Sequence, residues 1–183
     1  MPDLIYADIR DQISDGDLLL WRPTSLLGRA ISVASRSVYS HSAMAVWWHG
    51  QLMHLDMVSS GGRAETLSSQ VERYSGKIDW FRANRLRVNW DTHATIIAMI
   101  RTAGQPYGTW SLIRNMLSYS VVTRWLVRPN DNDIRNGYEV CSQAVSNAYR
   151  AGGVDPVLGL ADMWTSPGDL AHSLFFEEMG TLV

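Results

Sequence analysis

Apolar residues recur along the chain at two kinds of spacing, which predict a mixture of helices and short strands. Apolar residues at steps of three and four predict helices at residues 4–13, 26–35, 92–103, 110–117 and 138–150. A Ser-Pro pair predicts one more short helix at residues 166–173. Short apolar runs between turn residues predict strands at residues 17–21, 77–82 and 175–180. Residues 59–63 are predicted to be a loop, and 64–74 a short helix or an irregular edge. The fold class predicted is α+β.

Residues 41–58 hold two strand-like runs on either side of His49-Gly50, a pair that favours a two-residue hairpin turn. This turn sets a register in which Ala43 lies opposite Asp56, and Asp56 lies on the diagonal to His41. Because side chains alternate between faces, His41 shares one face with His54 and Asp56. The alanines between them leave room for a helix start to dock. The alternative is a solvated strand face that happens to carry polar residues.

The single cysteine, Cys141, falls in the first turn or so of the predicted helix 138–150, after a loop rich in turn residues. Unpaired N–H groups at a helix start favour the thiolate and can hold an oxyanion. A lone cysteine on a helix can equally be a small buried apolar residue. The nucleophile interpretation therefore needs a base from elsewhere. An imidazole beside a carboxylate, such as His41 beside Asp56, meets that need.

Composition narrows the possible functions. The 183 residues fit one domain, with 16 Lys and Arg against 18 Asp and Glu and no basic run, so we expect no nucleic-acid partner. One cysteine excludes an internal disulfide. No signal peptide or membrane-spanning run is visible, which predicts a cytoplasmic protein, with export by another route left open. The histidines show no close-spaced pair typical of zinc, so we expect no metal site. Eight tryptophans could form core or wall an apolar substrate groove.

Several separated stretches resemble one family, the circularly permuted NlpC-like cysteine hydrolases of the papain-like superfamily, in particular the YiiX/YebB-like branch. In that branch the histidine strand precedes the cysteine helix. The likeness rests on residues 16–20 (GDLLL), 40–43 (SHSA), 55–58 (LDMV), 104–107 (GQPY), 138–145 (YEVCSQAV) and 165–170 (TSPGDL). These pieces span roughly residues 14–175, and their order and spacing are more specific than any one of them.

The resemblance implies a single permuted papain-like domain over residues 1–183, with an antiparallel sheet packed against helices and an apolar insertion around residues 117–135. It implies that Cys141 is the nucleophile, at a helix N-terminus, and that His41 is the general base and acid. The third catalytic member would be an acid in the YiiX-like branch, which Asp56 matches. In ordinary NlpC-type members it is a histidine, which His54 nearly matches in position. The register favours Asp56.

The implied reaction forms an acyl-enzyme from an amide or ester, needs no metal or cofactor, and uses amides near Cys141 and Ser142 for the oxyanion. Tyr107 would also contact substrate. The expected substrate is a cell-wall-type peptide or a lipid-linked amide, with possible peripheral membrane or cell-wall contact. Gly108, where relatives often carry an acid, leaves the substrate class open. Two alternatives are a lecithin:retinol acyltransferase-like acyltransferase or phospholipase, and a non-catalytic binding module on the same fold.

Overall fold

The computed structural model describes residues 1–34, 36–105 and 141–183. Within these residues the strands are β1 (Asp3–Leu4), β2 (Leu18–Trp21), β3 (His41–Trp48), β4 (Gln51–Val58), β5 (Gly61–Thr66), β6 (Ile78–Arg82) and β7 (Glu177–Leu182). The described helices are α1 (Tyr6–Ile9), α2 (Leu26–Ala34), α3 (Leu67–Arg73), α4 (Thr92–Ile100), α7 (Cys141–Ala151) and α8 (Pro167–Ala171), with short 3-10 turns η1 (Arg10–Gln12) and η2 (Asp162–Trp164). The predicted α+β class is confirmed.

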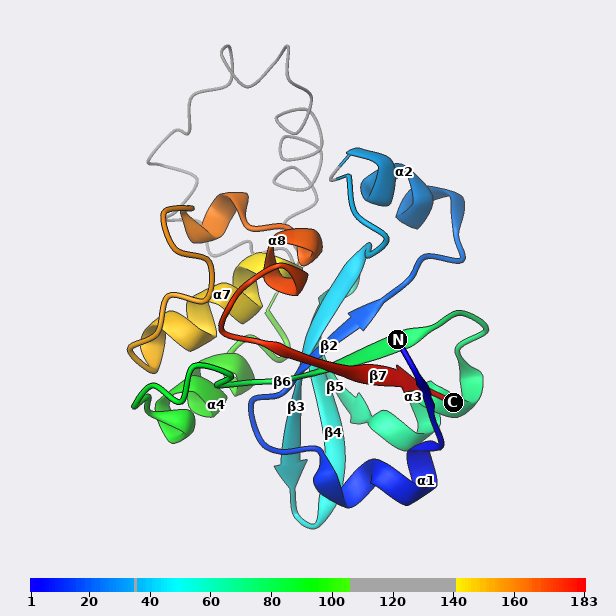
Figure 1. Ribbon diagram of the computed structural model, residues 1–183, viewed down its shortest axis with the longest axis horizontal. Helices are drawn as coiled ribbons and strands as arrows, with labels where there is room; N and C mark the ends of the chain where they lie inside the picture. The colour runs from blue at the N-terminus through cyan, green and yellow to red at the C-terminus, as the bar shows by residue number, and fades with distance from the viewer. Residues whose placement is uncertain (35, 106–140) are drawn as a thin grey trace.

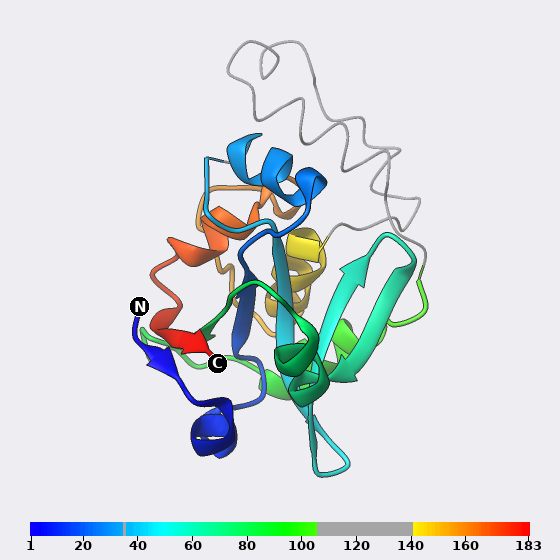
Figure 2. The same ribbon diagram turned by 90° about the vertical axis from the view of Figure 1, so that its right-hand side faces the viewer.

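The seven described strands form one sheet in the order β1-β7-β6-β2-β3-β4-β5. Neighbouring strands are antiparallel except at one edge, where β1 pairs in parallel with β7. This pairing brings the two chain ends together, as Figures 1 and 2 show from two directions. β3, the strand that begins with His41, lies between β2 and β4, so it is an interior strand.

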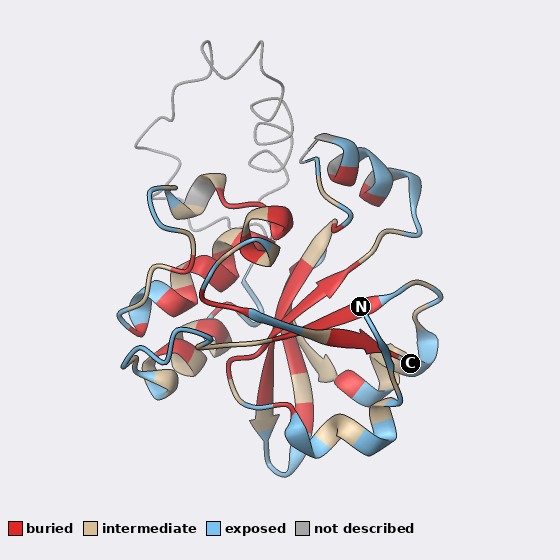
Figure 3. Cartoon of the chain, in the orientation of Figure 1, coloured by how far each residue is buried: buried red, intermediate tan, exposed pale blue. Residues whose placement is uncertain are grey.

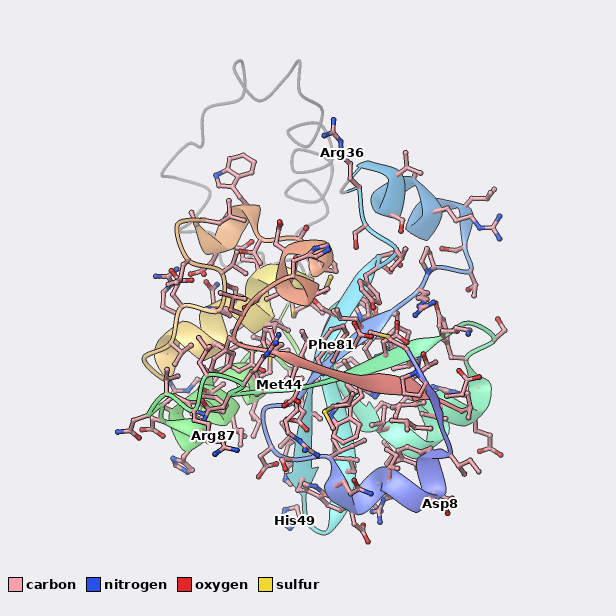
Figure 4. The ribbon with its side chains drawn as sticks, viewed as in Figure 1. Asp8, Arg36, Met44, His49, Phe81 and Arg87 are labelled. Carbon is pink, nitrogen blue, oxygen red and sulfur yellow. The ribbon has the colours of Figure 1, made fainter. Side chains whose placement is uncertain are left out.

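β3 and β4 form the predicted hairpin in the predicted register. Ala43 pairs with Asp56, and the pairing continues to the turn. His49 and Gly50 have φ values of 49° and 77°, the left-handed conformation that a two-residue type I′ turn requires at both positions. Figure 4 shows His49 at the tip of this hairpin. The hairpin therefore fixes the spacing between His41 and the polar residues of β4.

The prediction of a loop at residues 59–63 is wrong, because Gly61–Thr66 forms β5, which pairs antiparallel with β4. Because Gly62 has no side chain, β5 can lie directly against residues 102–105. A Cβ at Gly62 would lie 1.8 Å from the carbonyl oxygen of Thr102. The N–H of Gly62 also donates to the carbonyl of Gln105 at 2.8 Å. β5 is thus held between β4 and residues 102–105.

Two buried apolar clusters lie on opposite faces of the sheet. The first joins α7 to one face of β3 and β4, and its members include Met44, Leu55, Phe81, Ala144 and Val145. The second covers the other face and includes Leu19, Trp21, Ala43, Ala45 and Leu67. Figure 3 shows the buried strands running through the centre, and Figure 4 places Met44 and Phe81 there. In Figure 1, α4, α7 and α8 lie together on one side, with α1 and α3 on the other.

The expectation that a helix start docks beside the alanines, as the cysteine helix would have to, is wrong for α7. Ala43 and Ala45 pack with Trp21 and Leu67, whereas α7 packs on the opposite face with Met44. Large side chains from β2 and α3 fill the space that the small alanines leave. Cys141 therefore meets the hairpin at the first residues of β3 and not over the alanines.

Other predicted elements are confirmed or shortened. Ser166 caps α8 with a capping box to Asp169, as the Ser-Pro pair predicted. The helix predicted at residues 4–13 is instead divided among β1, α1 and η1. The helix predicted at residues 110–117, the insertion around 117–135 and Tyr107 lie outside the described residues. None of the helices described here combines the length and the apolar character needed to cross a membrane.

Candidate active site

His41 and Asp56 meet at the open end of the hairpin. His41 is the first residue of β3, and its Nε2 lies 2.7 Å from Oδ2 of Asp56 on β4. The Asp56 carboxylate can only accept, so Nε2 carries the proton and donates. The carboxylate is fully buried, while about a fifth of the His41 side chain remains exposed. Trp21, paired with His41 across β2 and β3, places its ring edge-on at 5.3 Å from the imidazole.

Cys141, the first residue of α7 as described, lies against the same imidazole. Its side chain and that of His41 lie close enough for each to shift the pKa of the other, and only 7% of the residue is exposed. Because Nε2 of His41 faces Asp56, Nδ1 is the ring nitrogen left to face the sulfur. The cysteine helix thus brings its thiol to the imidazole and carboxylate of the hairpin, with His41 in contact with both groups.

The charges of this pair support each other. Burial by itself lowers the pKa of His41, but the charge on Cys141 and the hydrogen bond to Asp56 outweigh it and raise that pKa well above its ordinary value. Burial by itself raises the pKa of the Cys141 thiol, but the charge and hydrogen bond of His41 lower it below its ordinary value. The arrangement therefore favours a thiolate beside an imidazolium.

Ser42 is a further neighbour of the sulfur, and sequence analysis assigned it no role. Its backbone N–H and its hydroxyl both lower the pKa of Cys141. The hydroxyl is fully buried and makes no hydrogen bond to any described residue. As the residue after His41, Ser42 points to the opposite face of β3, where α7 packs. The first two residues of β3, His41 and Ser42, therefore both lower the pKa of the Cys141 thiol.

His54, the alternative to Asp56, is fully buried and does not contact His41. Its Nε2 lies 3.7 Å from Oδ2 of Asp56 and 3.4 Å from Nη2 of Arg63. Burial, opposed by Asp56 and assisted by the charge of Arg63, lowers the pKa of His54 to about 4. His54 is therefore neutral at pH 7. Of the two candidates for the third position, Asp56 is the one that contacts the His41 ring.

Arg63 is a second site residue that sequence reasoning missed. It lies opposite Asp56 across β4 and β5, and its Nε and Nη2 donate to Oδ1 and Oδ2 of Asp56 at 3.1 and 2.8 Å. Burial raises the pKa of Asp56, but the hydrogen bonds from His41 and Arg63 hold it well below its ordinary value. A second hairpin turn after residue 58 would have placed Arg63 beside Asp56. The two glycines at residues 61 and 62, however, indicated a loop.

The two residues expected to contact the oxyanion or substrate differ in outcome. The Ser142 hydroxyl is buried and donates to the carbonyl of Thr165 at 2.5 Å, which holds α7 against the segment before α8. Only the backbone amide of Ser142 is thus left for a substrate. Tyr107 and the rest of residues 106–140 lie outside the described residues. Among the described side chains, no group of three or more His, Cys, Asp or Glu could hold a metal ion.

Comparison with known proteins relates this chain to one described fold. No protein-family profile and no curated protein matches the chain. Among solved structures, the fold is similar to that of a protein described as the metalloprotein YiiX from Escherichia coli O157:H7. The TM-score is 0.66 at 16% identity, and the match covers 92% of this chain and 97% of that one. The chain therefore has a YiiX-like fold, a seven-stranded sheet packed with helices over the described residues.

Proposed function

We propose that this chain is a cysteine hydrolase of the permuted papain-like type, with Cys141 as nucleophile, His41 as general base and acid, and Asp56 as the residue that orients His41. The observation that carries the proposal is the meeting of three groups: Nε2 of His41 lies 2.7 Å from Asp56, and His41 and Cys141 lie close enough for each to shift the pKa of the other. A buried structural cysteine does not need an imidazole whose other nitrogen is fixed by a carboxylate. The YiiX-like fold supports the same assignment.

The chemistry follows from the pair. The Cys141 thiolate attacks the carbonyl carbon, a C–S bond forms, and the oxyanion can accept from backbone N–H groups at Cys141 and Ser142. His41 gives its Nδ1 proton to the leaving amine or alcohol as the C–N or C–O bond breaks. Water then attacks the thioester, His41 takes a proton from that water, and the acid leaves. Asp56 stays ionised throughout and stabilises the imidazolium.

A metal plays no part in the proposed reaction. The structural neighbour is described as a metalloprotein, but here the candidate donors contact one another, and no three of the described ones form a metal-binding group. The Arg63 guanidinium also lies 2.8 Å from Asp56 and 3.4 Å from His54. A fixed positive charge at these two donors would repel a bound cation. The donor set therefore does not fit a metal, and no step is derived through one.

The proposed function is tested by trapping the acyl-enzyme. The full chain is mixed with a labelled cell-wall-type peptide or a labelled acyl lipid, quenched in acid, and measured by intact mass. We expect an acyl adduct that maps to Cys141 and is lost in Cys141→Ala and His41→Ala. His49→Ala, at the exposed hairpin tip, serves as the control and should react as the wild type does. Wild-type turnover by either of the first two variants would overturn the proposal.

A second candidate, hydrolysis or transfer of a lipid-linked acyl group, is favoured by the outer face of α2. Leu26 and Val33 are 85% and 79% exposed there, and Val38 just beyond is 60% exposed. Arg29 and Arg36 are exposed beside them, and Figure 4 shows Arg36 pointing away from the sheet. The chain has no Asp or Glu from residue 18 to residue 55. Exposed apolar residues among unopposed arginines suit an anionic lipid surface.

The inner side of α2, opposite this face, packs beside the start of β3. A Cβ on Gly28 of α2 would approach Oγ of Ser40, the residue before His41, to 3.2 Å. Sedimentation with phosphatidylserine-containing vesicles tests the candidate, with phosphatidylcholine vesicles as the neutral comparison. Binding should require the anionic lipid and be lost when Leu26 and Val33 are both replaced by Asp. Leu158→Asp, which changes another leucine 84% exposed, should bind normally. Equal binding by all variants would remove this candidate.

A further inference from the structure

Arg63 contacts two potential partners of His41 at once. Its guanidinium donates to both carboxylate oxygens of Asp56, at 3.1 and 2.8 Å. The same Nη2 that contacts Oδ2 also lies 3.4 Å from Nε2 of His54. Arg63 is paired with Asp56 across the strands, and its side chain is about one-third exposed, so it closes this polar group from the solvent side. Among the described residues, it is the fixed cation that contacts the candidate triad.

The contact with Arg63 sets the protonation of His54. A guanidinium nitrogen can only donate, so Nε2 of His54 must be the unprotonated ring nitrogen when it faces Nη2. The proton is then on Nδ1, which is buried and makes no hydrogen bond to any described residue. In this state His54 offers Asp56 no donor, although its Nε2 is only 3.7 Å from Oδ2. Without the guanidinium, the same nitrogen could take a proton and donate to Asp56.

We propose that Arg63 is a positioning residue that reserves the Asp56 carboxylate for His41 and keeps His54 from competing for it. The proposal rests on the function proposed above, because it assigns the third member of that site. Oδ2 of Asp56 accepts from His41 at 2.7 Å and from Arg63 at 2.8 Å, so a third donor from His54 would have to displace one of them. Arg63 prevents this by occupying the space on the His54 side.

Burial is the largest cause that disfavours protonation of His54 and stays when Arg63 is removed, but the charges around His54 point the same way as the geometry. The groups that face it are Asp56 on its own strand, His41 on β3, and Arg63 and Glu65 on β5. Asp56 and Glu65 favour the protonated ring, whereas Arg63 and His41 disfavour it. Removing Arg63 therefore leaves two carboxylates against one other imidazole. His54 would then take up a proton at a higher pH and share Asp56 with His41, which weakens the imidazolium beside Cys141.

Histidine titration by NMR reads this directly and requires no substrate. In wild type, His54 should titrate near 4; in Arg63→Met its pKa should rise by at least about one unit, and in Arg63→Lys, which keeps a charge, by less. Arg73→Met is the matched control, since Arg73 pairs with Glu65 but does not contact Asp56. Should Arg63→Met fail to fold, Arg63→Gln replaces it. A His54 that still titrates near 4 without the guanidinium overturns the proposal.

A double variant separates positioning from general structural support. We expect Arg63→Met to slow iodoacetamide alkylation of Cys141 at pH 6 by about tenfold, the effect of one pKa unit. In Arg63→Met with His54→Leu the competing donor is absent, because leucine has no N–H, so alkylation should recover by at least about threefold, half of the loss on a logarithmic scale. An unchanged loss in the double variant overturns the proposal. If instead the titration moves as expected but no variant or wild type forms an acyl adduct, the proposed function fails while the role of Arg63 stands.

Discussion

Nε2 of His54 lies 3.7 Å from Oδ2 of Asp56, beyond hydrogen-bond distance, although both residues lie on one face of β4. The same oxygen lies 2.7 Å from Nε2 of His41. We therefore predict that Asp56→Asn lowers kcat for the acyl substrate by about tenfold or more, because an amide does not offset the imidazolium charge. His54→Gln should stay within about twofold of wild type. Steady-state kinetics on both variants checks this.

The stability of each variant must be measured alongside, because Asp56 and His54 are both fully buried. Urea unfolding at pH 7 gives the fraction folded under assay conditions. Rates are then compared per folded molecule. A His54→Gln enzyme that loses as much activity as Asp56→Asn would show that the histidine, and not the carboxylate, is the third member of the site.

Ser42 is predicted to tune the thiol without being essential. Its hydroxyl lowers the pKa of Cys141, and its backbone N–H does so independently of the side chain. Ser42→Ala should therefore slow alkylation of Cys141 at pH 6 by about threefold, the effect of a rise of about half a pKa unit in the thiol. Ser40→Ala, two residues earlier, is the control and should alkylate at the wild-type rate. No change in Ser42→Ala would mean that the hydroxyl does not act on the sulfur.

Asp17 is predicted to stabilise the fold and to have no part in the chemistry. Its buried carboxylate accepts from the backbone N–H groups of Ser14 and Ala83 and from Nε1 of Trp80, at 2.8 to 3.0 Å. Asp17→Asn replaces one acceptor with a donor and leaves at least one of these groups unpaired. The free energy of unfolding should fall by about 2 kcal/mol.

Urea denaturation measures this loss, with Asp11→Asn as a control because Asp11 is exposed and pairs only with Arg10 among the described residues. Cys141 alkylation in folded Asp17→Asn should match the wild type. A variant as stable as the wild type would show that the three hydrogen bonds contribute nothing net to the fold.

The hairpin could be predicted from sequence because local rules determine it. A two-residue turn at His49-Gly50 and strict alternation of side chains suffice to place Asp56 on the diagonal to His41. Both belong to one continuous segment, so no long-range information was needed. The pairing of Ala43 with Asp56 confirms the register.

The helix that covers each face could not be predicted in the same way. Alternation shows which residues share a face, but long-range packing decides what covers it. Trp21 and Leu67 fill the alanine face, so α7 packs on the other. Arg63 was missed for a related reason. β5 depends on the close approach of Gly62 to Thr102. These residues are 40 positions apart, so no local sequence pattern predicts the contact.

The rate of Cys141 alkylation by iodoacetamide as a function of pH tests the central claim most directly. His41 lowers the pKa of the thiol, and the thiolate raises that of His41, so the thiolate should persist from below neutral pH upward. We predict a rate at pH 6 at least about tenfold above that of free cysteine, whose pKa is about 8.5, and a return to the free-cysteine profile in His41→Ala. A wild-type profile that rises only near pH 8.5 and is unchanged in His41→Ala would contradict the account.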